Sequence, residues 1–175
     1  MTKNGFKEEE ERALVDYKNN DRDYIRKLAF LSYESKVYQV RMYSVFLFGY
    51  LSTDNDILTL TRDDVSKDDN WRVQEVLAKA FNEYCRNTGY KSAIPVIDEW
   101  LRYDNSNTRR VVTERLRIWT SRPYLKVNLQ EAIKRLARLR EDASEYVRKS
   151  VGNALRDISR KFPELIKDEL ENWIL

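Results

Sequence analysis

Three stretches of the sequence decide the fold: Asp69-Asn70-Trp71-Arg72-Val73-Gln74-Glu75, Asp104-Asn105-Ser106-Asn107-Thr108-Arg109-Arg110 and Asp142-Ala143-Ser144-Glu145-Tyr146-Val147-Arg148-Lys149. Each opens with acidic or polar residues typical of a turn and then starts a helix whose first turn carries an arginine or a glutamine. When Gln74, Arg109 and Arg148 are aligned, apolar residues three and seven positions later fall into register, and Arg41 begins an earlier, weaker copy. The copies are 33, 35 and 39 residues apart. A period in this range, with one helix pair in each copy, is typical of an α-solenoid of the HEAT or armadillo kind.

The repeat predicts an all-α fold, a right-handed α-solenoid of about four HEAT-like helical repeats in a single domain. Two N-terminal helices are expected within residues 1–34, and the repeats are expected at 35–67, 68–103, 104–141 and 142–175. In right-handed stacks of such pairs, the second helix of each pair lines the concave side. The inner helices expected at 35–51, 71–86, 107–119 and 144–161 should therefore share one groove.

The composition excludes several kinds of chemistry. The 175 residues include no histidine and one cysteine, Cys85. Ser-His-Asp catalysis and His-ligated zinc are therefore excluded, and a lone cysteine forms neither an internal disulfide nor a metal-ligand cluster. No apolar run approaches the roughly 18 to 20 residues of a membrane span, and the charged residues 1–12 lack the apolar segment of a signal peptide. We expect a cytoplasmic protein that does not enter membranes.

The charge is distributed unevenly along the chain. Residues 1–100 carry 15 Lys/Arg against 18 Asp/Glu, whereas residues 101–160 carry 15 against 7. A basic middle-to-late section in a chain of net charge +3 indicates a polyanionic partner. The alternative interpretation is that these arginines only solvate the outer faces of helices.

Basic residues recur on the two last inner helices, and their repetition predicts a nucleic-acid surface. The predicted DNA-binding residues are Arg109, Arg110, Arg117, Arg122, Arg148, Lys149 and Arg156. A ladder of cations on successive parallel helices follows a phosphate backbone without reading bases. A polyanion with a phosphate backbone is therefore the expected partner.

Three carboxylates and two tryptophans lie among these cations. The carboxylates are Glu75, Glu114 and Asp157, and ordinary helix ion pairs such as Arg110 with Glu114 are one explanation for them. Trp71 starts an inner helix and Trp119 ends one. A tryptophan at such a position beside a basic groove stacks on a base or holds a cationic base against its π face, and core packing is the alternative.

The sequence resembles the HEAT-like-repeat DNA alkylation repair family, the AlkD/AlkC-type alkylpurine DNA glycosylase superfamily. The resemblance covers about residues 35–175 and is strongest from 69 to 161, in the stretches 71–81, 109–123 and 145–159. Members of this family are mainly bacterial, and are either alkylpurine DNA glycosylases or relatives that bind DNA without excising a base. The resemblance implies a monomeric protein that acts on double-stranded DNA with alkylated bases and needs no metal or cofactor.

The resemblance also implies a mechanism. An N3- or N7-alkylated purine is cationic and leaves readily, so catalysis needs negative charge beside the developing oxocarbenium sugar, a positioned water and an aromatic face for the base. Glu114 and Asp157 match acidic positions of the family's active sites, with Glu75 as a third candidate. Trp71 and Trp119 would face the lesion. This family is thought to act without flipping the base fully into a pocket, unlike most glycosylases.

Two features depart from the family's pattern. Arg115 stands where the motif usually has a small residue, and the chain is shorter at its N-terminus than typical glycosylases of this type. Two other functions therefore stay open beside excision: a non-catalytic HEAT-repeat module that binds DNA, and a protein-interaction scaffold. Release of a methylated purine distinguishes the first function, and DNA binding without release distinguishes the second.

Overall fold

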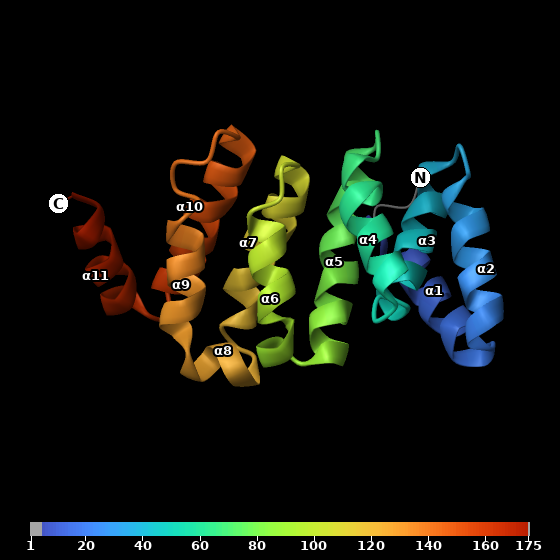
Figure 1. Ribbon diagram of the computed structural model, residues 1–175, viewed down its shortest axis with the longest axis horizontal. Coiled ribbons are helices and arrows are strands. Elements are labelled where there is room, and N and C mark those ends of the chain that lie inside the picture. The colour runs from blue at the N-terminus through green and yellow to red at the C-terminus, as the bar shows by residue number, and fades with distance from the viewer. Residues whose placement is uncertain (1–4, 175) are drawn as a thin grey trace. The chain divides into compact units, whose positions relative to one another are not determined.

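The computed structural model describes residues 5–174, which form eleven α-helices and one turn of 3₁₀-helix, with no β-strand (Figure 1). The predicted all-α helical-repeat fold is confirmed. Contacts within the chain define two compact units, Met1–Thr88 and Gly89–Leu175, each of which is described by itself below.

The first unit is built around one helix that is buried on nearly all sides. Its elements are α1 (Lys7–Asn19), α2 (Arg22–Tyr33), α3 (Tyr38–Tyr50), α4 (Asn55–Asp63), the 3₁₀ turn η1 (Val65–Lys67) and α5 (Trp71–Thr88). Helix α3 contacts α1, α2, α4 and α5. The run from Ser44 to Gly49 is buried. Ser44 is a polar residue in this run, and its hydroxyl donates to the carbonyl of Ala29 at 2.6 Å.

A glycine sets the distance between α3 and α5. A Cβ atom placed on Gly49 would lie 2.9 Å from the Cα of Ala80. The backbones of the two helices therefore approach more closely than any larger residue at position 49 allows.

The second unit places two long helices against each other. Its elements are α6 (Tyr90–Leu101), α7 (Ser106–Trp119), α8 (Pro123–Val127), α9 (Leu129–Ala137), α10 (Glu145–Ser159) and α11 (Pro163–Ile174). Helix α7 packs on α10, and α6 and α9 also contact α7. The short helix α8 was not predicted from the sequence; Pro123 starts it, at a position where its missing N–H costs nothing.

The repeat alignment is confirmed by burial. At the third position after the aligned residue, the side chains of Ser44, Leu77, Val112 and Val151 are buried. At the seventh position, those of Phe48, Phe81, Leu116 and Leu155 are buried. The units meet in sequence at Gly89, whose φ of 88° is a backbone conformation that favours glycine.

Candidate functional site

The aligned arginines and glutamine of the repeat close the loop that precedes their own helix. Arg41, Arg109 and Arg148 each donate from Nη1 to the carbonyl oxygens five and six residues earlier, at distances between 2.5 and 3.3 Å. Gln74 donates from Nε2 to the carbonyl of Asp68, also six residues earlier, at 2.6 Å. These contacts explain why the first turn of each inner helix carries one of these two residue types.

Arg109 has a second bond that removes it from solvent. Its Nε and Nη2 donate to the two carboxylate oxygens of Asp142 at 2.7 and 2.8 Å, and the two side chains are 13% and 6% exposed. Asp142 also accepts from the backbone N–H of Ser144 at 2.9 Å. Desolvation, the largest effect, raises the pKa of Asp142, but the bonds from Arg109 and Ser144 outweigh it, so its pKa lies below the ordinary value.

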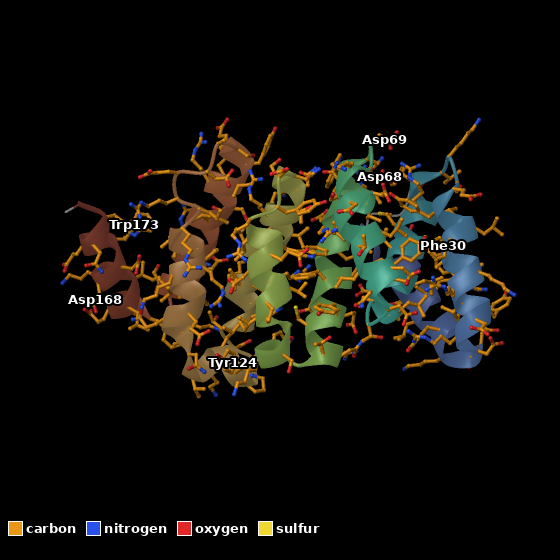
Figure 2. The ribbon with its side chains drawn as sticks, viewed as in Figure 1. Phe30, Asp68, Asp69, Tyr124, Asp168 and Trp173 are labelled. Atoms are coloured by element: carbon orange, nitrogen blue, oxygen red, sulfur yellow. The ribbon has the colours of Figure 1, made fainter. Side chains whose placement is uncertain are left out.

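The first unit repeats this arrangement. Arg41 donates from Nε and Nη2 to Asp68 at 2.8 and 2.9 Å, and from Nη2 to Asp69 at 2.6 Å. Asp68 and Asp69 lie at the end of α5 where the helix begins (Figure 2). The structure thus gives Arg109, like Arg41, an ion pair inside the protein in place of the phosphate contact predicted for it.

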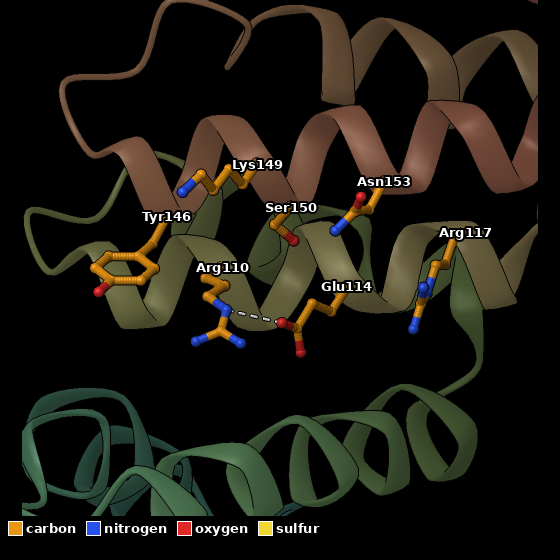
Figure 3. Close-up of a pocket in the computed structure, with 7 residues that line it drawn as sticks. All are labelled: Arg110, Glu114, Arg117, Tyr146, Lys149, Ser150 and Asn153. Carbon is orange, nitrogen blue, oxygen red and sulfur yellow. Dashed lines mark hydrogen bonds and ion pairs between the residues drawn. The ribbon is translucent and has the colours of Figure 1, made fainter.

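The predicted DNA-binding residues Arg110, Arg117 and Lys149 meet in a pocket between α7 and α10. The pocket has a volume of about 170 Å³ and is lined by Arg110, Glu114, Arg117, Tyr146, Lys149, Ser150 and Asn153 (Figure 3). The hydroxyls of Thr113 and Ser150 join the two helices through a buried hydrogen bond of 2.7 Å. Three cations and one carboxylate therefore surround this space.

Glu114 lines this pocket, and one of its two carboxylate oxygens accepts a hydrogen bond. Oε1 accepts from Arg110 Nε at 2.8 Å, an ion pair between residues one helical turn apart (Figure 3). The alternative explanation of Glu114 as an ordinary helix partner of Arg110 is therefore realised in the geometry.

Asp157 lies in a neighbouring pocket of about 450 Å³ rather than beside Glu114. This second pocket is lined by Arg117, Ile118, Thr120, Ser121, Asp157, Ile158, Arg160 and Lys161. Asp157 accepts from Arg117 Nη1 at 2.7 Å and pairs with Arg160 at 3.3 Å. Two arginines thus neutralise this carboxylate.

The two candidate tryptophans differ in exposure. Trp119 is 0% exposed and its ring packs edge-on against Tyr90 at 5.8 Å, which corrects the prediction that it faces a lesion. Trp71 is 60% exposed, with the guanidinium of Arg72 4.6 Å from its ring. Glu75 follows Trp71 by one helical turn and is also exposed. Among residues 5–174, no ion pair involves Glu75, in contrast with Glu114 and Asp157.

The remaining predicted cations are exposed. Arg122 lies just before α8, Arg156 lies on α10, and Arg148 lies in the first turn of α10. Arg115, which departs from the family's motif, is half-buried and does not line either pocket.

The sequence prediction missed three residues of the first pocket, Tyr146, Ser150 and Asn153. The spacing of Tyr146, Ser150 and Asn153 places them on one face of α10, so helical periodicity from Lys149 was the signal that locates them. Tyr146 is 71% exposed and supplies the aromatic surface of this pocket.

Two classes of site find no support in the part of the chain that the structure describes. Within it, no three His, Cys, Asp or Glu side chains come together as metal ligands. None of its helices is both long and apolar enough to cross a membrane.

Burial raises the pKa of the Cys85 thiol, so this cysteine is held protonated in the core.

Comparisons with known proteins found one matching family and three similar proteins. The family described as DNA alkylation repair enzyme matches residues 5–172. The crystal structure of AlkD2 from Streptococcus mutans is 69% identical and superposes with a TM-score of 0.96, over 99% of this chain and 84% of that one. The structure of smu.31 from Streptococcus mutans UA159 is 70% identical with a TM-score of 0.93, over 95% and 83% of the two chains. The uncharacterized protein YhaZ of Bacillus subtilis is 37% identical over 78 residues, which span 42% of this chain and 22% of YhaZ.

Proposed function

Because the chain belongs to the family of DNA alkylation repair enzymes, we propose that it binds alkylated duplex DNA and hydrolyses the bond between the sugar and a cationic purine. In this proposal the second unit holds backbone phosphates, and α5 of the first unit faces the modified nucleotide. The two roles rest on different residues and are tested separately.

The pocket between α7 and α10 supports phosphate binding. Arg110, Arg117 and Lys149 line this pocket beside Glu114, and the acids that pair with Arg117 and Lys149, Asp157 and Glu145, do not line it. A phosphate gains from all three cations, whereas a cationic purine is repelled by them. The expected ligand of this pocket is therefore the DNA backbone rather than the damaged base.

The single observation that carries the excision proposal is the placement of Trp71 and Glu75 one helical turn apart on α5. Both side chains are exposed and lie one turn apart, so they share a face of the helix. The carboxylates of Glu114 and Asp157 are each bonded to arginine, which reduces the negative charge they offer to a sugar cation. Glu75 bears no ion pair among the described residues, so its full charge is available.

The chemical step follows from this pair. The glycosidic C1′–N bond breaks, its electrons neutralise the cationic purine, and the sugar becomes an oxocarbenium ion stabilised by Glu75. A water then adds to C1′ and gives its proton to Glu75. The ring of Trp71 lies against the purine while it is still cationic. The products are the alkylated base and an abasic site.

Base release from DNA containing 7-methylguanine tests this assignment. We expect Glu75→Gln to lower the release rate by about 10²-fold, the usual cost of removing one group that stabilises the transition state, while leaving the affinity for the duplex unchanged. The matched control is Glu164→Gln, which makes the same change at an exposed glutamate in α11. Loss of release in Glu114→Gln with full release in Glu75→Gln would contradict the assignment.

Binding is tested by the salt dependence of the affinity for the same duplex. We expect Arg110→Ala, Arg117→Ala and Lys149→Ala each to reduce the slope of log K against log salt by about 0.9, the value for one phosphate contact. Lys134→Ala removes an exposed cation from α9 of the same unit and should leave the slope unchanged.

A second function, DNA binding without excision, is favoured by the ion pairs at Glu114 and Asp157. If the two acids that match the family's motif serve only as partners of Arg110 and Arg117, the chain recognises DNA and performs no chemistry. A steep salt slope in the wild type together with no base release would assign this function.

A further inference from the structure

We propose that the Nε and Nη2 edge of Arg148 is a binding site for a DNA phosphodiester, held ready by the protein before DNA arrives. This inference rests on the proposed function, because it names one more phosphate contact on the second unit. It concerns a part of α10 outside both pockets.

The protein fixes the position of the Arg148 guanidinium. Nη1 donates to the carbonyl of Asp142 at 2.5 Å and to that of Ala143 at 3.0 Å, which ties the side chain to the loop before α10. A long exposed arginine normally loses much side-chain entropy when it binds an anion. Arg148 has given up much of that freedom in the folded protein, so less is lost on binding.

The equivalent arginines in two other copies of the repeat show what the Nε and Nη2 edge of such a guanidinium binds. Arg41 and Arg109 use Nη1 for the same two carbonyls and direct Nε and Nη2 at the two oxygens of a carboxylate, Asp68 or Asp142. Arg148 has the same anchor. Among the residues that the structure describes, no carboxylate bonds to its Nε or Nη2.

The acids nearest to Arg148 in sequence are already engaged. Glu141 pairs with Arg140 at 3.4 Å, and Glu145 pairs with Lys149 at 2.8 Å. Asp142 uses both oxygens for Arg109 and one of them also for the N–H of Ser144. Asp142 and Glu145 lie near enough to Arg148 for its charge to lower their pKa values, but neither bonds to its Nε or Nη2.

The chemistry of this edge requires an anion with two adjacent oxygens. A carboxylate and the two non-bridging oxygens of a phosphodiester both meet that requirement. The second unit carries 18 Lys/Arg against 13 Asp/Glu, so its field attracts a polyanion more strongly than an isolated acidic side chain. We therefore assign the site to DNA and treat an acidic side chain of another protein molecule as the competing outcome.

The chain itself supplies the variant that tests this site. At the equivalent position of the first unit, Gln74 keeps the loop contact through Nε2 without a charge. Arg148→Gln should likewise keep the loop closed while removing the anion-binding edge. We expect an unchanged melting temperature and a decrease of about 0.9 in the salt slope for a duplex long enough to cover the unit, equal to one lost phosphate contact. Arg148→Lys keeps the charge without the fork and should recover only part of the affinity.

Four outcomes decide the matter. If Arg148→Gln leaves the salt slope unchanged while Arg110→Ala lowers it, this inference is wrong and the proposed function stands. If the wild-type protein does not bind DNA, both the inference and the proposed function are wrong. A change in sedimentation of the DNA-free protein on Arg148→Gln, with the slope unchanged, would assign the edge to a carboxylate of a second copy and would also overturn the inference. Selective movement of the Arg148 ¹⁵Nε resonance on adding duplex, with that of Arg109 fixed, would support it.

Discussion

The two units use the same repeat for different ends. In the first unit, the aligned arginine, Arg41, is consumed by Asp68 and Asp69, and the unit carries 14 Lys/Arg against 16 Asp/Glu. In the second unit, Arg109 likewise forms an ion pair with an aspartate, whereas no described carboxylate bonds to Arg148 in the next repeat. The difference arises because each arginine takes its acid from the loop of the following repeat. A repeated arginine is thus structural where the next loop supplies an aspartate, and available to a ligand where no described residue does.

The largest expected effect comes from breaking a paired arginine. Arg109→Ala leaves Asp142, which is nearly buried, without its partner, and we expect a loss of about 3–5 kcal/mol of unfolding free energy. Arg148→Ala removes an exposed side chain and two hydrogen bonds to carbonyls, and we expect a loss of about 1 kcal/mol. Urea unfolding followed by circular dichroism measures both. Equal losses would show that the two arginines do not differ as described.

A smaller effect is expected from two glycines, one in each unit. Gly49→Ala forces a Cβ against the backbone of Ala80, and we expect a loss of about 1–3 kcal/mol because α3 and α5 must separate. Gly152→Ala on α10 meets no atom within 4 Å, so we expect a gain of about 0.5–1 kcal/mol from helix propensity. Thermal unfolding of the two variants tests the contrast. A Gly49→Ala protein as stable as the wild type would contradict the close approach of these helices.

The smallest effect is the contribution of the paired aspartates to acid sensitivity. Desolvation raises the pKa of Asp142, but the bonds from Arg109 and Ser144 prevail and lower it below the ordinary value, which is about 3.9 in an unfolded chain. A lowered pKa gives stability that is complete above the unfolded value and is lost as the pH falls through the folded value. We therefore expect wild-type stability to fall below about pH 4, and to fall less steeply in Asp142→Asn.

The control for this prediction is Asp168→Asn, which changes an exposed carboxylate on α11 (Figure 2). Its dependence of unfolding free energy on pH should match that of the wild type. A parallel fall in all three proteins would mean that Asp142 does not contribute to the acid transition.

The fold was predictable because the repeat signal and the core are the same residues. Phe81 and Leu116 were aligned by spacing alone, and both are buried, since a helix packed on two neighbours must present apolar residues at fixed intervals. Helix α8 escaped prediction because five residues are too few for periodicity to appear. The expectation of a single domain stays a prediction beside the two compact units.

The site was predictable only in part, because residue type and spacing do not say where a partner lies. Arg109 and Arg110 are neighbours in sequence, yet one bonds Asp142, 33 positions away, and the other lines a pocket. Trp119 looked available because it ends a helix, whereas it is fully buried and its ring packs against Tyr90. Such burial depends on contacts between residues distant in sequence, which a local pattern does not contain.

The carboxylate of Asp142 belongs to one repeat in sequence and completes the previous one in space, while also ordering the first turn of its own helix. The repeats of this chain are consequently not interchangeable, because such an ion pair joins two neighbouring repeats. A graft or deletion cut at the loops would strand an arginine on one side and its acid on the other. A designed chimera therefore has to take the arginine and the aspartate that it bonds from the same parent protein.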